Sequence, residues 1–142
     1  MRMQVGVAKG MRQVLVIEDN SADVDLLRRA FVEHGMTEQI VALEDGEQAL
    51  RYLEDLRCKP DVSLVILDLN IPKHDGIEVL NRYRMHPLMV DIPVAVFTSS
   101  GSPAEKDRAM TLGVKAYLRK PMELDEYMAI GATFREILVK ER

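Results

Sequence analysis

The sequence predicts an α/β fold in which helices cover both faces of a parallel sheet. Short apolar runs rich in Val and Ile alternate with helical segments five times along the chain. The runs are continuously apolar, which is typical of strands that are buried on both faces. The chain has 142 residues without a repeat or an interior linker, which suits one domain with one core.

The first strand, helix and second strand follow in order. Residues 13–17 are rich in Val and Ile and form the first expected strand. Asn20 supplies the N-cap of a helix whose apolar residues recur at helical spacing until Gly35 ends it. Residues 39–43 form the second expected strand, which completes one strand-helix-strand unit.

The second helix, third strand and third helix repeat the pattern. Asp45 caps the second helix, which carries an apolar stripe and which we expect to end at Lys59-Pro60. The third strand covers residues 62–67. The third helix begins near Asp75 and ends before Pro87, because the residue before a proline is pushed out of the α region.

The last two strand-helix pairs complete the alternation. The fourth strand covers residues 93–97 and begins with a proline, where a missing N–H is tolerated. Ser102 is the N-cap of the fourth helix, a proline follows it, and Gly113 closes the helix. The fifth strand covers residues 115–118, and an amphipathic helix follows over residues 123–139.

Composition limits the class of protein. The net charge of −4 argues against nucleic acid as a partner, since phosphate binding needs clustered Lys and Arg. The single cysteine, Cys58, excludes an internal disulfide and a zinc site built from several cysteines. No apolar run approaches the ~20 residues of a membrane span, and the start lacks the apolar segment of a signal peptide. We therefore expect a cytoplasmic domain at residues 13–142, without membrane contact, after a flexible leader at residues 1–12.

Polar side chains follow four of the five strands at the point where each strand ends. Glu18 and Asp19 follow the first strand, and Asp68 follows the third. Thr98 follows the fourth and Lys120 the fifth. The carboxyl ends of parallel strands share one edge, so these groups can converge. Three carboxylates together repel one another unless a cation is present, and hard oxygen ligands suit Mg²⁺. Lys120 adds a mobile positive charge, so the set predicts an aspartate that accepts a phosphoryl group.

These residues, in this order, resemble the response-regulator receiver domains of two-component signalling. Further matching pieces are Asn70, Pro72, Asp75-Gly76, Tyr117 and Pro121. The resemblance covers about residues 13–140. It implies a flavodoxin-like, doubly wound (βα)5 fold with a parallel five-stranded sheet in the order 2-1-3-4-5.

The resemblance implies that Asp68 takes a phosphoryl group from a phosphohistidine. The donor would be a sensor histidine kinase or a phosphotransfer protein. The side chains of Asp19 and Asp68, with the backbone carbonyl of Asn70, would bind Mg²⁺, and Glu18 would act through a metal-bound water. The chain would then be a signalling switch rather than an enzyme, although it would speed its own phosphorylation and dephosphorylation with Mg²⁺.

The resemblance also implies the switching residues. Thr98 would hydrogen-bond the phosphoryl group and move toward it, and Lys120 would pair with the phosphate. Tyr117 would turn inward in the active state. The bond between Lys120 and Pro121 would be cis. The changed surface would comprise the fourth helix, the fifth strand and the fifth helix, and it would bind a downstream protein target.

A finer resemblance rests on residues 16–23, residues 44–50 and the long connection at residues 86–93. These segments are similar to those of single-domain regulators that are paired with bacterial phytochrome histidine kinases. The resemblance implies a phytochrome as the kinase partner and a homodimer, since such proteins often dimerise. The apolar stripe of the last helix is the candidate dimer surface.

Three other functions fit part of the pattern. An aspartyl-phosphate phosphatase needs a second acid two residues past its nucleophile, and Asn70 cannot serve as one. A nucleotide-binding protein of this fold needs a Gly-rich loop after the first strand, where Glu18 and Asp19 would repel phosphate. An interaction module that no longer cycles phosphate remains open, because only phosphorylation excludes it. Taken alone, Asp68 could also be a helix cap or a turn residue.

Overall fold

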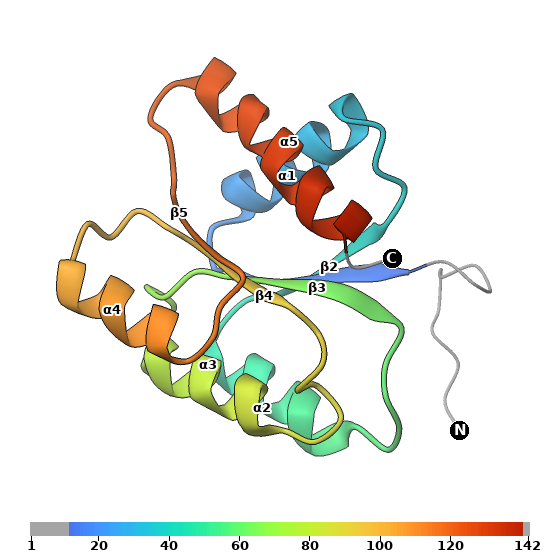
Figure 1. The fold of residues 1–142 in the computed structure, drawn as a ribbon, viewed down its shortest axis with the longest axis vertical. Coiled ribbons are helices and arrows are strands. Elements are labelled where there is room, and N and C mark those ends of the chain that lie inside the picture. The colour runs from blue at the N-terminus through green and yellow to red at the C-terminus, as the bar shows by residue number, and fades with distance from the viewer. Residues whose placement is uncertain (1–11, 141–142) are drawn as a thin grey trace.

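The five strands form one parallel sheet in the order β2-β1-β3-β4-β5. The computed structural model describes residues 12–140, so most of the expected leader lies outside the described residues. The strands are β1 (Gln13–Ile17), β2 (Gln39–Leu43), β3 (Val62–Leu67), β4 (Val94–Thr98) and β5 (Ala116–Arg119). The helices are α1 (Ser21–Glu33), α2 (Gly46–Asp55), α3 (Gly76–Met85), α4 (Pro103–Thr111) and α5 (Leu124–Lys140). Figure 1 shows α1 and α5 on one side of the sheet and α2, α3 and α4 on the other. The strand order and layers confirm the predicted fold.

Two hydrophobic layers lie on opposite faces of the sheet, because successive side chains of a strand point to opposite sides. In β1, Leu15 and Ile17 belong to the layer under α2 and α3, while Val14 and Val16 belong to the layer under α1 and α5. All four side chains are almost completely buried. Burial on both faces explains why the strands are continuously apolar in sequence.

The predicted N-caps hold the helices that start at the carboxyl edge of the sheet. The Asn20 side chain accepts a hydrogen bond from the Ala22 N–H at 2.9 Å. Asp45, Asp75 and Ser102 cap α2, α3 and α4 in the same way. α1, α2, α4 and α5 begin within a few residues of the preceding strand, whereas a longer loop, residues 68–75, separates β3 from α3.

The largest boundary difference from the sequence prediction is at α2, and β4, β5 and α5 each lie one residue later than expected. α2 ends at Asp55 rather than at Lys59-Pro60. The Arg57 guanidinium donates to the carbonyl oxygens of Glu54 and Leu56 at 3.1 and 3.2 Å, so a side chain caps the last turn before the proline is reached. β4 begins one residue later than expected, at Val94, although the carbonyl before it still accepts a ladder hydrogen bond.

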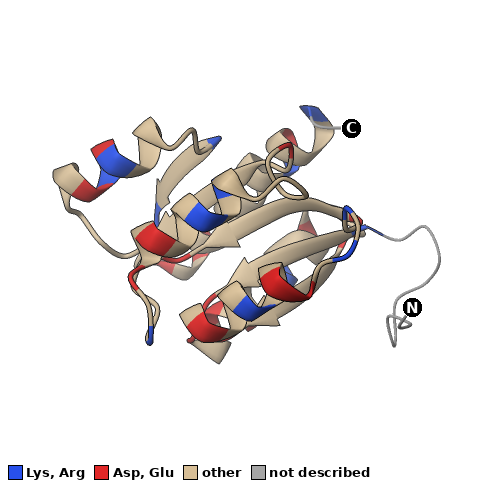
Figure 2. Cartoon of the chain, turned by 90° about the horizontal axis from the view of Figure 1, so that it is seen from below, with Lys and Arg blue, Asp and Glu red and all other residues tan. Residues whose placement is uncertain are grey.

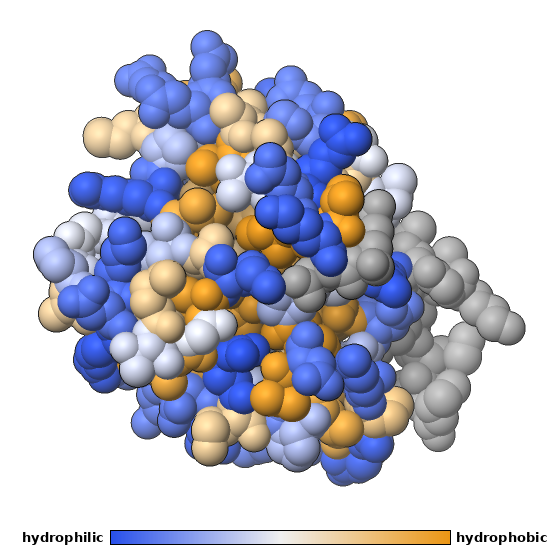
Figure 3. Space-filling view, viewed as in Figure 1, coloured by the Kyte–Doolittle hydropathy of each residue, from blue (hydrophilic) through white to orange (hydrophobic). Residues whose placement is uncertain are grey.

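Hydrophilic residues cover the outer sides of the helices on the face drawn in Figure 3, and apolar atoms show mainly between the elements. Acidic and basic residues are interleaved along the helices in Figure 2. Among residues 12–140, no helix combines the length and the apolar character needed to cross a bilayer.

Candidate functional site

The carboxyl ends of β1, β3, β4 and β5 bring the predicted site residues to one edge of the sheet. Glu18 and Asp19 follow β1, Asp68 follows β3, Thr98 ends β4, and Lys120 follows β5. One ligand atom from each of the three acids lies within 4.8 Å of those from the other two. Glu18 and Asp68 are buried and Asp19 is exposed, so the cluster opens to solvent on one side.

The Asp68 carboxylate is held by a hydrogen bond at each oxygen. Its Oδ1 accepts from the backbone N–H of Asn70 at 2.9 Å, and its Oδ2 accepts from Nζ of Lys120 at 2.9 Å. The Asp68 N–H donates to the Ile17 carbonyl at 3.0 Å, which continues the pairing of β3 with β1. The buried strand therefore fixes the backbone, and two donors orient the carboxylate.

Lys120 is the centre of the charged network. Its Nζ donates to Glu18 Oε1 at 2.5 Å, to Asp68 Oδ2 at 2.9 Å and to Asp23 Oδ2 at 3.0 Å. An ammonium group has three N–H donors, so each donor has one carboxylate partner. Burial alone would lower the pKa of Lys120, but these three hydrogen bonds raise it overall, and the side chain stays charged.

Asp23 is a site residue that the sequence reasoning missed. It lies in the first turn of α1, where an acid stabilises the helix N-terminus whether or not it also belongs to a site. The usable signal was its place five residues after Glu18, on the helix that begins beside the cluster. Only the structure shows that its side chain turns to Lys120.

Burial is the main cause that raises the pKa of Glu18 to about 7, and the negative charge of Asp68 adds to it. The hydrogen bonds from Lys120 and from the Asn20 N–H act in the opposite direction. Three carboxylates, those of Glu18, Asp23 and Asp68, pair with the Lys120 ammonium group, and the Asp19 carboxylate lies close to those of Glu18 and Asp68. This excess of negative charge, made of hard oxygen donors and open on one side, fits a divalent cation such as Mg²⁺.

Thr98 is fully buried at the end of β4 and links the loop after β3 to the loop after β4. Its Oγ1 accepts from the side-chain amide of Asn70 at 3.3 Å and from the Ser100 N–H at 3.2 Å. Because the Asn70 backbone also holds Asp68, a displacement of the Thr98 hydroxyl would reach both the Asp68 loop and the loop before α4.

Tyr117 is partly buried and packs against the layer of α2, α3 and α4, on the same face as its register partner Val96. Its hydroxyl oxygen is shielded from solvent. Burial raises the pKa of Tyr117, and the nearby charges of Glu105 and Asp68 add to the shift. Glu105 of α4 and Asp68 are therefore both near the tyrosine, while its inward turn remains a prediction.

The bond between Lys120 and Pro121 is trans, because the structure has no cis peptide bond among residues 12–140. The expectation of a cis bond was therefore wrong. The trans form of an X–Pro bond is favoured by only about 0.5–1 kcal/mol, so the residue types alone do not decide the isomer. From the trans form, Lys120 still reaches its three carboxylate partners.

The loop after Asp68 is packed closely on both sides. The Gly46 N–H at the start of α2 donates to the Pro72 carbonyl at 3.0 Å. A Cβ placed on Gly76 would lie 2.3 Å from the backbone oxygen of Leu69, so only glycine fits there. The close approach of Leu69 gives a structural reason for the glycine at position 76.

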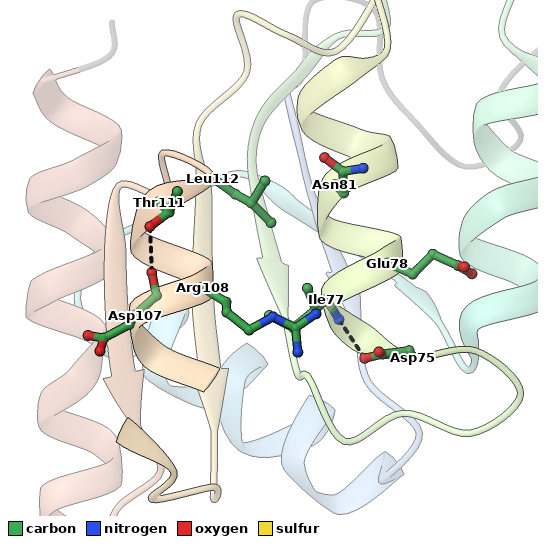
Figure 4. Close-up of a pocket in the computed structure, with 8 residues that line it drawn as sticks. All are labelled: Asp75, Ile77, Glu78, Asn81, Asp107, Arg108, Thr111 and Leu112. Atoms are coloured by element: carbon green, nitrogen blue, oxygen red, sulfur yellow. Dashed lines mark hydrogen bonds between the residues drawn. The ribbon is translucent and has the colours of Figure 1, made fainter. Parts of the chain in front are cut away.

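A separate groove of about 630 Å³ opens between α3 and α4. Figure 4 shows Arg108 extending from α4 toward the start of α3, where Asp75 accepts a hydrogen bond from the Ile77 N–H. The residues that line this groove do not include Lys120 or the carboxylates that pair with Lys120. The groove is therefore distinct from the charged site.

Comparison with known proteins gives a family match that includes all of the site residues. Residues 14–130 match the family model described as response regulator receiver domain. A probable methanogenesis regulatory protein FilR2 of Methanothrix harundinacea is 39% identical over 117 residues, which are 80% of this chain and 74% of that protein. Response regulator Rcp1 of Synechocystis is 32% identical over 116 residues, 80% of this chain and 79% of its own.

Solved structures agree with this match. The phosphorylated cyanobacterial phytochrome response regulator RcpA superposes with a TM-score of 0.82 at 28% identity, over 94% of this chain and 97% of that chain. The Mn²⁺-bound form of Rcp1 superposes with a TM-score of 0.78 at 28% identity, over 88% of this chain and 92% of that chain.

Proposed function

Because this chain belongs to the family of response regulator receiver domains, we propose that it is a phosphorylation-dependent switch with Asp68 as the phosphoacceptor. The observation that carries the proposal is the arrangement at Asp68. Its carboxylate is fixed by Asn70 and Lys120 and lies among the acids that fit a divalent cation. A lone helix cap or turn residue would not need these partners.

The proposed transfer uses groups already at the site. An oxygen of Asp68 attacks the phosphorus of a phosphohistidine, an O–P bond forms, the P–N bond breaks, and the imidazole leaves with its electron pair. Lys120 then pairs with a phosphoryl oxygen, and the Thr98 hydroxyl donates to another. Burial of Asp68 excludes most water from the carboxylate.

Glu18, Asp19 and Asp68, with the Asn70 carbonyl, are the residues that would hold Mg²⁺. When bound, the ion would neutralise charge that develops on the phosphoryl oxygens. The acidic cluster supports this assignment, and so does the metal-bound form of the related Rcp1. Burial and the negative charge of Asp68 raise the pKa of Glu18, and a bound cation would offset part of that negative charge.

The switch itself would run from Thr98 to the surface. Phosphorylation would draw the Thr98 hydroxyl from the Asn70 amide, and Tyr117 would turn inward into the space released. The affected surface is formed by α4, β5 and α5. The output is a protein contact, either with a downstream target or with a second copy in a homodimer, and the chain is a switch rather than a metabolic enzyme.

The partner that supplies phosphate is proposed to be a sensor histidine kinase or a phosphotransfer protein. The similarity to phytochrome response regulators supports a bacterial phytochrome as this kinase. Histidine kinases draw the phosphoryl group from ATP, so we place this exchange in the cytoplasm.

The deciding experiment is phosphorylation by phosphoramidate with Mg²⁺, followed by intact mass. We expect the wild type to gain one phosphoryl group, and Asp68→Asn to gain none. Asp61→Asn is the matched control, because Asp61 is an exposed acid at the opposite end of the same strand. Its uptake should equal that of the wild type.

Two outcomes would change the assignment. A folded wild type that gains no phosphoryl group would support the non-cycling interaction module instead. Uptake that persists in Asp68→Asn would place the phosphate on another residue. Analytical ultracentrifugation of both forms over a wide concentration range would test the homodimer, and a monomer throughout would remove it.

A further inference from the structure

Asp23 holds Lys120 from outside the candidate metal site. Its Oδ2 accepts from Lys120 Nζ at 3.0 Å, and its side chain is only 19% exposed. It is not among the three acids whose ligand atoms converge. Neither the phosphoryl transfer nor the cation therefore accounts for its place beside Lys120.

Tyr127 of α5 fixes the orientation of Asp23. The Tyr127 hydroxyl lies 3.1 Å from Asp23 Oδ1, to which it donates, and 3.3 Å from the Asp23 backbone carbonyl. Tyr127 is buried, and its ring packs edge-on against Phe97 with centroids 5.3 Å apart. One Asp23 oxygen is thus occupied by a rigid aromatic residue, and the other is left for the ammonium group.

Phosphorylation changes the demands on Lys120. In the structure its three N–H donors serve Glu18, Asp23 and Asp68, one each. A phosphoryl group on Asp68 would need Lys120 as a counter-charge. A bound cation would be held by the acids that include Glu18. Asp23 is the one partner of Lys120 that is neither the phosphoacceptor nor one of the three acids that fit a cation.

We propose that Asp23 is a positioning residue that retains Lys120 in its resting place and competes with the phosphoryl group for it. This inference rests on the proposed function of Asp68. Asp23 also places a negative charge near the incoming anion, which acts in the same direction. Tyr127 makes the competition stronger because it prevents Asp23 from turning away, and it links the site to α5.

The test measures the affinity for beryllium trifluoride, a tetrahedral mimic of the phosphoryl group, by calorimetry at saturating Mg²⁺. Asp23→Asn should bind it about threefold to tenfold more tightly than the wild type, the size of a coupling between contacting residues. Tyr127→Phe should shift affinity in the same direction by less. Asp23→Glu, which restores the charge, should return affinity toward the wild type.

The matched control is Asp25→Asn. Asp25 lies on the same helix two residues later, is exposed, and lies near Arg28 rather than Lys120. The Asp25→Asn substitution removes the same charge and should leave the affinity for beryllium trifluoride unchanged. Mere structural damage at Asp23 would weaken binding, so tighter binding is a readout that a structural role does not produce.

The lifetime of the aspartyl phosphate gives a second readout by intact mass. We expect a longer lifetime in Asp23→Asn, since Lys120 is then free to follow the phosphoryl group. Equal or weaker affinity in Asp23→Asn, or an equal gain in Asp25→Asn, would overturn the inference while the wild type still takes up phosphate. A wild type that takes up none would overturn the proposed function and this inference together.

Discussion

Nζ of Lys120 lies 2.5 Å from Oε1 of Glu18, and yet burial raises the pKa of that carboxyl to about 7. The ammonium group is shared with two other acids, so it only partly offsets the cost of burying Glu18. The site therefore carries electrostatic strain that pH or a cation can relieve.

The first prediction concerns pH. Folded Glu18 keeps its proton up to about pH 7, whereas the unfolded chain releases it near its usual value of 4.5. The folded state thus binds more protons between these values, and the contribution of Glu18 to the free energy of unfolding falls as pH rises through this window. Relative to the wild type, Glu18→Gln should gain stability on the order of 1–3 kcal/mol between pH 4.5 and 8.

Urea unfolding in EDTA at several pH values would measure this difference. Glu33→Gln, at an exposed position on α1, is the control and should show a constant difference from the wild type. A difference for Glu18→Gln that does not change with pH would contradict the prediction.

The second prediction concerns the cation. Binding of Mg²⁺ to the folded chain alone should raise the free energy of unfolding by about 2.7 kcal/mol at a hundred times its dissociation constant. The effect should largely vanish in Asp19→Asn, which removes the exposed acid of the cluster. Thermal unfolding with Mg²⁺ and with EDTA measures it, and a full shift in Asp19→Asn would place the cation elsewhere.

The third prediction concerns the buried hydroxyl of Thr98. Thr98→Val keeps the shape but leaves the Asn70 amide and the Ser100 N–H without their acceptor. We expect a loss of about 1–2 kcal/mol in the free energy of unfolding. Thr98→Ser keeps the oxygen and should lose less. Urea denaturation compares the two, and an equal or larger loss in Thr98→Ser would contradict the prediction, because the methyl group would then matter at least as much as the hydroxyl.

The fourth prediction concerns close packing behind Asp68. Gly76→Ala would place a Cβ 2.3 Å from the Leu69 backbone oxygen, which cannot move aside without shifting the loop. We expect a loss of about 1–3 kcal/mol. In the control Gly101→Ala, the nearest atoms belong to the flexible Arg119 guanidinium at 3.3 Å, and the loss should be smaller. Equal melting temperatures for the two variants would contradict the prediction.

Much of the fold could be predicted because its signals are local. A strand that is buried on both faces is apolar at successive positions, and caps such as Asn20 and Asp45 stand next to the helices they start. The positions of Glu18, Asp68 and Lys120 followed from the same logic, since parallel strands bring their carboxyl ends to one edge. The roles of these residues in phosphoryl transfer remain proposals.

The order of the elements, and the polar residues that reach the sheet edge, can be predicted from the sequence alone. The folded structure is needed to see that Lys120 divides its donors among three carboxylates, that Asp23 is one of them, and that the bond to Pro121 is trans. These contacts join residues that are far apart along the chain. Lys120 and Glu18 are 102 residues apart, so their hydrogen bond depends on how whole elements pack to within an ångström.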